Sequence, residues 1–284
     1  MRFIALFALL PLLTSCFSIT VDPRALLSSP DGAVRVRSLP CDARQGVSEP
    51  DAATTANALD PRAIHVLTWN INKEQDAAWE GDLARFVEES DIVLLQEAAL
   101  RRPLRDMVER SRLRWIMASS FMFGAEDVGV LTAARVAPIE VCTLRAFEPL
   151  IRLPKSAVIA WFRLTGRGRT LAVANIHAIN FSSVDAYRSQ VEALAAALVG
   201  HRGPIVFAGD FNTWNDARTG VLHAIADRLG LIEITFATDT RSLFFGRQLD
   251  HIFVRGLEMI ESSSIPVTSS DHNPVAATLR VTEH

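Results

Sequence analysis

From about residue 61 onward, hydrophobic residues gather in short, almost continuous runs that end in Gly, Asn, Asp or Ser. Runs of this length and composition predict buried β-strands. Because most of them are apolar on both faces, we expect both faces of the resulting sheets to be covered. The expected strands lie at residues 63–70, 91–97, 113–120, 128–134, 157–164, 169–177, 204–209, 249–256 and 274–281.

Other segments place their apolar residues at helical spacing. Helices are expected at 77–90 and 216–230, with a third that begins after Ser182 or Ser183 as its N-cap. In this third helix the apolar residues from Val191 to Leu198 fall at i, i+3, i+4 and i+7. Many strands with a few helices between them predict an α/β (α+β) sandwich.

The N-terminus reads MRFIALFALLPLLTSC, with Arg2 before an apolar core and small residues before Cys16. This pattern predicts a secretory signal peptide that is too short for a resident membrane helix. Residues 13–16, LTSC, also resemble the bacterial lipobox, in which cleavage leaves the cysteine as a lipidated N-terminus. An ordinary signal peptide that happens to contain a cysteine is the alternative.

Under the lipobox interpretation, residues 1–15 are a lipoprotein signal peptide and residues 16–60 are a tether or irregular lead-in, rich in Pro, Ser, Ala and Asp. The folded domain is expected at 61–284. The exported protein would be held by acyl chains on Cys16 at the cell membrane or outer membrane, facing the periplasm or exterior. Cys41 and Cys142 remain, and in an oxidising compartment they could pair.

Composition narrows the function only a little. Lys+Arg is 29 and Asp+Glu is 32, so the formal net charge is −3. A net charge this close to neutral does not by itself indicate a nucleic-acid-binding protein, although a local groove can still be basic. No Cys/His spacing indicates a zinc site.

Polar residues follow several of the apolar strands at the point where each strand ends. Singly, each has an ordinary explanation as a turn residue, a helix cap or a core histidine. Together they predict one site, because burying such groups is costly unless they bind a cation or one another. The residues are Asn70, Asn72, Glu97, His177, Asn180, Asp210, Asn212, Asp250, Asp271 and His272.

The segments WNI, LLQE, NIH, GDFN, LDHIF and SDHNP, in that order, resemble the successive motifs of the endonuclease/exonuclease/phosphatase superfamily of DNase I and exonuclease III. The longer stretches WNINKEQDAAW and LDHIFVRGL resemble its bacterial YafD-like branch. The resemblance covers roughly residues 64–284. It implies a DNase I-like, four-layer α/β/β/α sandwich with the site at one end of the paired sheets.

The resemblance also implies a ligand set for a divalent cation. Glu97 would be the main metal ligand, with Asn70 and Asp271 binding directly or from just outside. Carboxylate, amide and water oxygens favour Mg²⁺ or Mn²⁺ over zinc.

Catalytic roles follow from the same resemblance. His272 would accept the proton of the attacking water, with its ring held by Asp250. Asp210 and Asn212 would position that water and a phosphate oxygen, and His177 would donate a hydrogen bond to a phosphate oxygen. Asn72 and Asn180 would contact the substrate.

Four other features receive structural interpretations. His251 alternates to the opposite strand face from Asp250. Lys155 is expected to be a solvated lysine, with an approach to phosphate as the alternative. The six arginines between Arg101 and Arg114 are expected on a solvated helix face, with a phosphate-binding edge as the alternative. The adjacent pair Phe244 and Phe245 is expected in the core and not in a hairpin that dips into a bilayer.

The resulting hypothesis is a divalent-metal-dependent phosphoesterase, foremost a phosphodiester hydrolase that acts on nucleic acid. A phospholipid phosphodiesterase of the sphingomyelinase kind, or a phosphomonoesterase, is the alternative enzyme. A non-catalytic binding lipoprotein on the same fold would be expected to have lost part of the polar set, and all of it is present. No protein partner is implied.

Overall fold

The computed structural model describes residues 19–21, 26–28, 35–36 and 57–282. The expected signal peptide, the lipid-bearing Cys16 and most of the expected tether therefore lie outside the described residues. Cys142 takes part in a disulfide, but Cys41, with which the sequence allows it to pair, lies outside these ranges. Within them, no helix combines the length and apolar character needed to cross a membrane.

The first of two large sheets contains most of the N-terminal half of the folded region. Its strand order is β1-β6-β7-β5-β4-β17-β16, and β2 also pairs with β6. The strands are β1 (Ile19–Thr20), β2 (Leu26–Ser28), β4 (Ile64–Asn70), β5 (Ile92–Ala99), β6 (Arg114–Phe123), β7 (Glu126–Ala134), β16 (Leu257–Ser264) and β17 (Val275–Val281).

The second large sheet has the order β12-β15-β11-β10-β9-β8-β3. Its strands are β3 (Arg35–Val36), β8 (Glu140–Phe147), β9 (Pro154–Arg163), β10 (Thr170–His177), β11 (Ile205–Asp210), β12 (Ile232–Glu233) and β15 (Asp250–Arg255). A separate small hairpin pairs β13 (Leu243–Phe244) with β14 (Arg247–Gln248).

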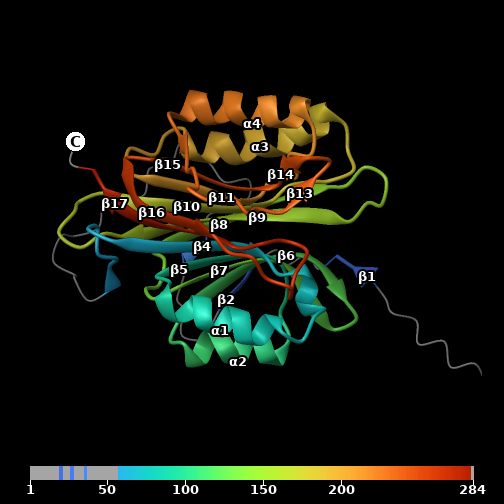
Figure 1. The fold of residues 1–284 in the computed structure, drawn as a ribbon, viewed down its shortest axis with the longest axis horizontal. Helices are drawn as coiled ribbons and strands as arrows, with labels where there is room; N and C mark the ends of the chain where they lie inside the picture. Colours follow the sequence, from blue (N-terminus) through green and yellow to red (C-terminus); the bar gives the residue numbers. More distant parts are fainter. Residues whose placement is uncertain (1–18, 22–25, 29–34, 37–56, 283–284) are drawn as a thin grey trace, which may run out of the picture.

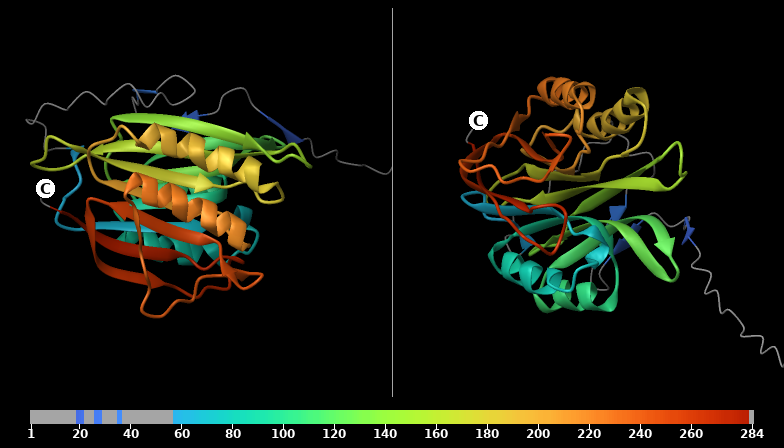
Figure 2. Two further views of the ribbon diagram at one scale, coloured as in Figure 1. Left: turned by 90° about the horizontal axis from the view of Figure 1, so that it is seen from above. Right: turned by 45° about the vertical axis from the view of Figure 1, so that its right-hand side comes forward.

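The two sheets pack face to face, and a pair of helices covers each outer face (Figures 1 and 2). Helices α1 (Trp79–Glu89) and α2 (Arg102–Arg110) cover the first sheet, and α3 (Val184–Leu198) and α4 (Asp216–Leu229) cover the second. A short 3₁₀ helix, η2 (Asn72–Glu74), follows β4. The expected four-layer α/β/β/α sandwich is confirmed.

Strand periodicity explains how one strand serves two layers of the core. In β4, Val66 belongs to the apolar cluster between the sheets, whereas Leu67 and Trp69 belong to the cluster beneath α1 and α2. The strands are apolar on both faces because both faces are covered, as the sequence predicts.

Buried polar residues also join the two sheets. The side-chain amide of Gln96 on β5 donates to Asn175 Oδ1 on β10 at 2.7 Å and to Thr68 Oγ1 at 3.0 Å. The Asn175 amide in turn donates to the Leu131 carbonyl at 3.0 Å. Gln96 lies next to Glu97 and Asn175 lies two residues before His177, so these bonds fix the two strand ends that carry site residues relative to each other.

Candidate active site

Two parallel strand pairs direct polar residues to the same end of the sandwich. β4 runs parallel to β5, and β10 runs parallel to β11. Parallel neighbours end at the same edge of a sheet, so Asn70 lies near Glu97 and His177 lies beside Asp210. The backbone register continues from His177 to Asp210 and on to Asp250 of β15, which places three functional groups on adjacent strands.

His272 reaches this row from the loop before β17. The indole N–H of Trp69 donates to the His272 carbonyl at 2.8 Å, and Ser270 Oγ donates to the Asn70 carbonyl at 2.7 Å. These bonds attach the loop to the end of β4. The tryptophan of the WNI segment therefore positions the histidine of the SDHNP segment.

A cavity of about 310 Å³ opens at this end of the molecule. The structure brings together nine of the ten expected site residues along its wall, and the tenth, Asp250, lies behind His272 with its Oδ2 2.7 Å from His272 Nδ1. The lining residues are Asn70, Asn72, Lys73, Glu97, His177, Asn180, Phe181, Asp210, Asn212, Phe244, Leu249, Asp271 and His272.

Backbone strain accompanies several of these side chains. Glu97 has a φ of 50° where the register of β5 against β7 shifts between Leu95 and Ala98, and Asn212 has a φ of 51°. Non-glycine residues adopt this conformation at a cost and do so most often at functional positions. The bulge in β5 lets Glu97 turn into the cavity while the neighbouring Gln96 stays buried between the sheets.

Two lysines that sequence reasoning did not place in the site flank Glu97. Lys73 Nζ is paired with Glu97 Oε2, and Lys155 Nζ lies 3.2 Å from Glu97 Oε1 and 2.9 Å from His177 Nε2. The expectation of a solvated Lys155 is wrong, since its ammonium group is buried among site residues. Burial lowers the pKa of both lysines, and for Lys73 the positive charge of Lys155 adds to this.

Asp210 is held by two hydrogen bonds from its surroundings. Asn70 Nδ2 donates to Asp210 Oδ2 at 3.0 Å, and the Asn212 N–H donates to Oδ1 at 2.9 Å. Burial raises the pKa of Asp210, with the Asp250 charge acting in the same direction, while His272 and the two hydrogen bonds oppose the rise. Asp210 is thus a fixed carboxylate that takes up a proton more readily than an exposed aspartate.

The two histidines of the site differ in charge. Burial would lower the pKa of His272, but the charge and hydrogen bond of Asp250, with Asp210 and Asp271, outweigh it and raise the pKa to about 10. Burial, together with the positive charges of Lys155, His272 and Lys73, holds the pKa of His177 well below its usual range. His272 is therefore an imidazolium at neutral pH, and His177 is neutral and accepts a hydrogen bond from Lys155 at Nε2.

Arg218 on α4 is a further residue that the sequence did not single out. It is fully buried, and its guanidinium lies over the rings of Tyr187 and Trp214. It donates to the carbonyls of Ile179 and Asn212, at 2.8 and 3.1 Å, and also to that of Asn180. Arg218 thereby holds the two loops that carry Asn180 and Asn212.

The remaining structural expectations had mixed outcomes. His251 bonds Thr213 and Glu233 at 2.8 and 2.6 Å, in keeping with a structural role. The arginines of α2 and the residues after it face solvent, apart from the half-buried Arg101, so the solvated helix face is what the structure has. The expected core location of Phe244 and Phe245 is wrong, because 38% of Phe244 and 78% of Phe245 are exposed.

The oxygen donors at the cavity suit a hard divalent cation. Among the described residues, no three His, Cys, Asp or Glu side chains lie close enough together to ligate one ion. A cation here would be held by the Glu97 carboxylate with Asn70, Asp271 and water, which is how Mg²⁺ binds in many proteins. The lysines now paired with Glu97 have flexible stems, so they can leave its carboxylate when a cation binds.

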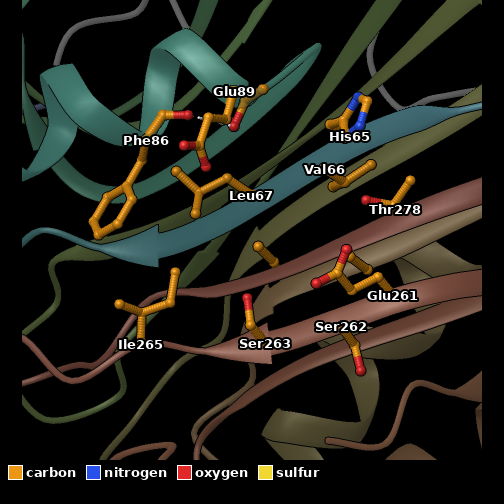
Figure 3. A pocket seen from close by; sticks show the side chains of 13 residues that line it. His65, Val66, Leu67, Phe86, Glu89, Glu261, Ser262, Ser263, Ile265 and Thr278 are labelled. Carbon is orange, nitrogen blue, oxygen red and sulfur yellow. Dashed lines mark hydrogen bonds between the residues drawn. The ribbon is translucent and has the colours of Figure 1, made fainter.

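A larger hollow of about 510 Å³ lies between the end of α1 and strands β4, β16 and β17 (Figure 3). His65 at its edge is paired with Asp91, at 2.9 Å between ring nitrogen and carboxylate. Its other ionisable residues, Glu89 and Glu261, are acidic and would repel a phosphate. Volume alone would favour this hollow, but the charges and the convergent polar groups favour the smaller cavity.

A cavity that combines ammonium groups, a fixed carboxylate and a histidine–aspartate couple is suited to holding an anionic ester and activating water against it. Fold and site together define the class as a hydrolase of the phosphoesterase type. Comparison with known families agrees, because the Endonuclease/Exonuclease/phosphatase family model matches residues 67–272. The chain belongs to this family.

The comparisons also give individual relatives. A UPF0294 protein of Yersinia enterocolitica is 40% identical over 213 residues, which is 75% of this chain and 82% of the relative. A UPF0294 protein of Klebsiella pneumoniae is 39% identical over 240 residues, 84% of this chain and 90% of the relative.

Among solved structures, the catalytic domain of human Nocturnin with a bound sulfate matches with a TM-score of 0.61 at 16% identity, covering 79% of this chain and 96% of that one. A mannosyl-6-phosphatase of Bacteroides thetaiotaomicron matches with a TM-score of 0.59 at 18% identity, covering 76% and 99%. At this level of identity the likeness shows the fold.

Proposed function

We propose that the protein is a divalent-cation-dependent phosphodiester hydrolase. The observation that carries the proposal is the arrangement around one cavity of Asp210, the His272–Asp250 couple and the lysine-flanked Glu97. The neighbours whose names mention a bound sulfate or a sugar-phosphate substrate support a site for tetrahedral anions on this fold.

The lysines would hold the substrate. A phosphodiester carries negative charge on its non-bridging oxygens, and that charge grows in the transition state. The ammonium groups of Lys73 and Lys155 are placed to bind these oxygens once they part from Glu97. A divalent cation bound at Glu97, Asn70 and Asp271 would add positive charge and polarise the phosphate.

Proton transfer would begin at Asp210. His272 was expected to accept the proton of the attacking water, but its raised pKa leaves it already protonated at neutral pH. Asp210 Oδ2, 4.0 Å from His272 Nε2, is the acceptor held in place at the cavity. The His272 imidazolium, oriented by Asp250, would stabilise the phosphate charge and supply a proton to the leaving oxygen.

Nucleic acids and phospholipids both contain this bond, and the cavity residues alone favour neither. Phe181 and Phe244 at the cavity wall offer apolar surface to a group next to the phosphate. We further propose that the chain is exported and anchored through a lipid on Cys16, as the lipobox-like segment indicates. That proposal can be checked by mass spectrometry of the mature N-terminus.

The test of function is a substrate panel. Plasmid DNA, RNA, a bis-aryl phosphodiester, an aryl phosphomonoester and phospholipid vesicles would be incubated with the purified protein, with Mg²⁺ or with EDTA. We expect Mg²⁺-dependent cleavage of diesters that is lost in Asp210→Asn and His272→Ala, while circular dichroism stays unchanged. Hydrolysis that survives EDTA or both substitutions would refute the proposal, and a complete lack of turnover would favour a binding protein.

A further inference from the structure

Most of the large apolar side chains that the described residues expose lie at the end of the sandwich that contains the cavity. They project from five places: β1, the β6–β7 turn, the β8–β9 loop, the segment after β10 and the β13–β14 hairpin. Two of these places adjoin the cavity directly, since Phe181 and Phe244 line it. The exposed apolar residues at this end include Phe123, Phe147, Leu150, Ile151, Phe181 and Phe245.

The degree of exposure is unusual for such residues. Leu150 is 81% exposed, Phe245 is 78% exposed and Ile151 is 63% exposed. A concentrated apolar patch on a soluble surface indicates a contact with a partner or a membrane. Leucine and isoleucine have no ring on which a nucleic-acid base could stack. Their presence at the tips favours a lipid surface over a nucleic acid.

Phe245 has a backbone conformation that is unfavourable for a phenylalanine. The pairing of Leu243 with Gln248 and of Phe244 with Arg247 leaves Phe245 and Gly246 as a two-residue turn, and both have positive φ, at 48° and 76°. Turns of this kind favour Asn or Asp at the first position. Inside the molecule the ring contacts only Phe244 and Trp214 among described aromatic rings. A strained and exposed phenylalanine points to a contact outside the molecule.

β1, the described strand that follows the predicted lipid attachment at Cys16, lies at the same end. β1 pairs with the end of β6, with Ile19 opposite Phe123 and Thr20 opposite Met122. Cys16 precedes Ile19 by three residues, and three extended residues span at most about 11 Å. β1 and the β13–β14 hairpin lie on the same side of the molecule (Figure 1). Acyl chains on Cys16 would therefore enter a bilayer close to the β6–β7 turn.

We propose that this end of the molecule is a bilayer-docking surface. The apolar tips enter the headgroup region, foremost Leu150 and Ile151 of the β8–β9 loop and Phe245 of the β13–β14 hairpin. The cavity then faces the lipid headgroups. Arg152, exposed beside Ile151, suits anionic headgroups. The docking itself does not depend on catalysis. The corollary that the substrate is a headgroup phosphodiester rests on the proposed function.

The first experiment measures which residues meet the membrane. Single spin labels would be placed at positions 150, 245, 199 and 232 of the mature protein bound to vesicles of phosphatidylethanolamine and phosphatidylglycerol. Val199 and Ile232 are the matched controls, because they are exposed apolar residues at the opposite end of the sandwich. We expect labels at 150 and 245 to be several-fold more accessible to oxygen than to a water-soluble nickel complex, and those at 199 and 232 to be the reverse.

The second experiment separates docking from catalysis. In the triple variant Leu150→Ser, Ile151→Ser, Phe245→Ser, hydrolysis of vesicle phospholipid should fall about tenfold while hydrolysis of a water-soluble diester is retained. The control Val199→Ser, Ile232→Ser should change neither rate. His272→Ala should abolish both rates yet keep the spin-label pattern. Equal accessibility at all four positions, or a protein that does not bind vesicles, would overturn the docking proposal. A correct pattern without phospholipid hydrolysis in the wild type would overturn only the corollary.

Discussion

At the scale of single residues, the main feature of the site is the number of charges within one small cavity. Glu97 is flanked by Lys73 and Lys155, while Asp210 lies between His177 and His272. Groups buried this deeply are stable only because each charge has a partner. When a ligand binds, we therefore expect charged groups to exchange partners. A lysine, for example, would leave Glu97 and bind a phosphate oxygen.

A first prediction concerns Lys155. Lys155→Met removes an ammonium group that we expect to bind a phosphate oxygen, so KM for a soluble diester should rise by about tenfold, as for loss of one charged hydrogen bond. Steady-state kinetics would measure this, with thermal unfolding as a check on folding. Arg105→Met, which removes an exposed charge from α2, is the control. An unchanged KM in Lys155→Met would contradict the assigned role.

A second prediction concerns the His272–Asp250 couple. The pKa of His272 in the folded protein is raised to about 10, above its ordinary value of 6.5. A raised histidine pKa contributes stability that is fully present below about pH 6.5 and is lost as pH rises through about 10. Asp250→Asn removes the main partner, so the His272 pKa should fall, and the loss of stability between these pH values should largely disappear.

NMR titration of the His272 ring and denaturant unfolding from pH 6 to 10 would measure both effects. Asp227→Asn, an exposed aspartate of α4, should alter neither. A His272 ring that titrates near 6.5 in the wild type would show that the aspartates do not hold its proton. It would also restore His272 as the proton acceptor.

At the scale of elements, the apolar pattern predicted nine strands of the two sheets and three of the four long helices. It failed where tertiary context decides. The segment that forms α2 was expected as a helix face only through its arginines, and the apolar pattern of Leu104, Met107 and Val108 on its buried face was not singled out. Strand β16, LEMIESSS, is an exposed edge strand with too few apolar residues to stand out.

The motif segments contain residues with structural roles as well as candidate catalytic residues, and the sequence alone did not separate the two groups. Trp69, Gln96 and Asn175 belong to the same short segments as Asn70, Glu97 and His177, but they hold strands and loops together. Alternation along β4 explains why Trp69 and Asn70 face different layers. The bulge in β5 separates Glu97 from Gln96. Asn175 and His177 share one face of β10, so only their places along the strand separate their roles. Lys155 was misjudged because nothing in LPKS shows that the start of β9 lies beside the end of β5.

A third prediction concerns the link between α4 and the site loops. Arg218→Met removes a buried guanidinium and leaves several carbonyls without their donor, so the free energy of unfolding should fall by about 3 kcal/mol. Because the loops of Asn180 and Asn212 lose their attachment, kcat should fall even at temperatures where the variant is folded. Urea unfolding and kinetics would measure these effects, and Arg228→Met on the same helix is the exposed control. A variant that loses stability but keeps full kcat would limit Arg218 to a structural role.

At the scale of the whole molecule, the sequence predicted the layered sandwich and the convergence of distant strand ends. The expected residues at the ends of β4, β5, β10 and β11 meet because two parallel strand pairs end at one side, which follows from the topology. Antiparallel β15 adds Asp250, and the loop before β17 adds Asp271 and His272. The sequence did not predict what surrounds the cavity. Phe244 and Phe245 were expected in the core because hydrophobicity predicts burial on average, and only the assembled fold shows the hairpin standing clear of the sheets.

A fourth prediction links cation binding to the stability of the whole protein. A ligand that binds only the folded state stabilises it by RT ln(1 + [L]/Kd), which is about 2.7 kcal/mol at one hundred times Kd. Millimolar Mg²⁺ should therefore raise Tm, and EDTA should reverse the rise. Glu97→Gln should abolish the rise together with activity. Glu261→Gln, which changes a carboxylate of the second hollow, should preserve both. The readout does not depend on knowing the substrate. A rise in Tm that persists in Glu97→Gln would place the cation elsewhere in the molecule, and a catalytically active wild type with no rise would point to a cation that binds only together with substrate.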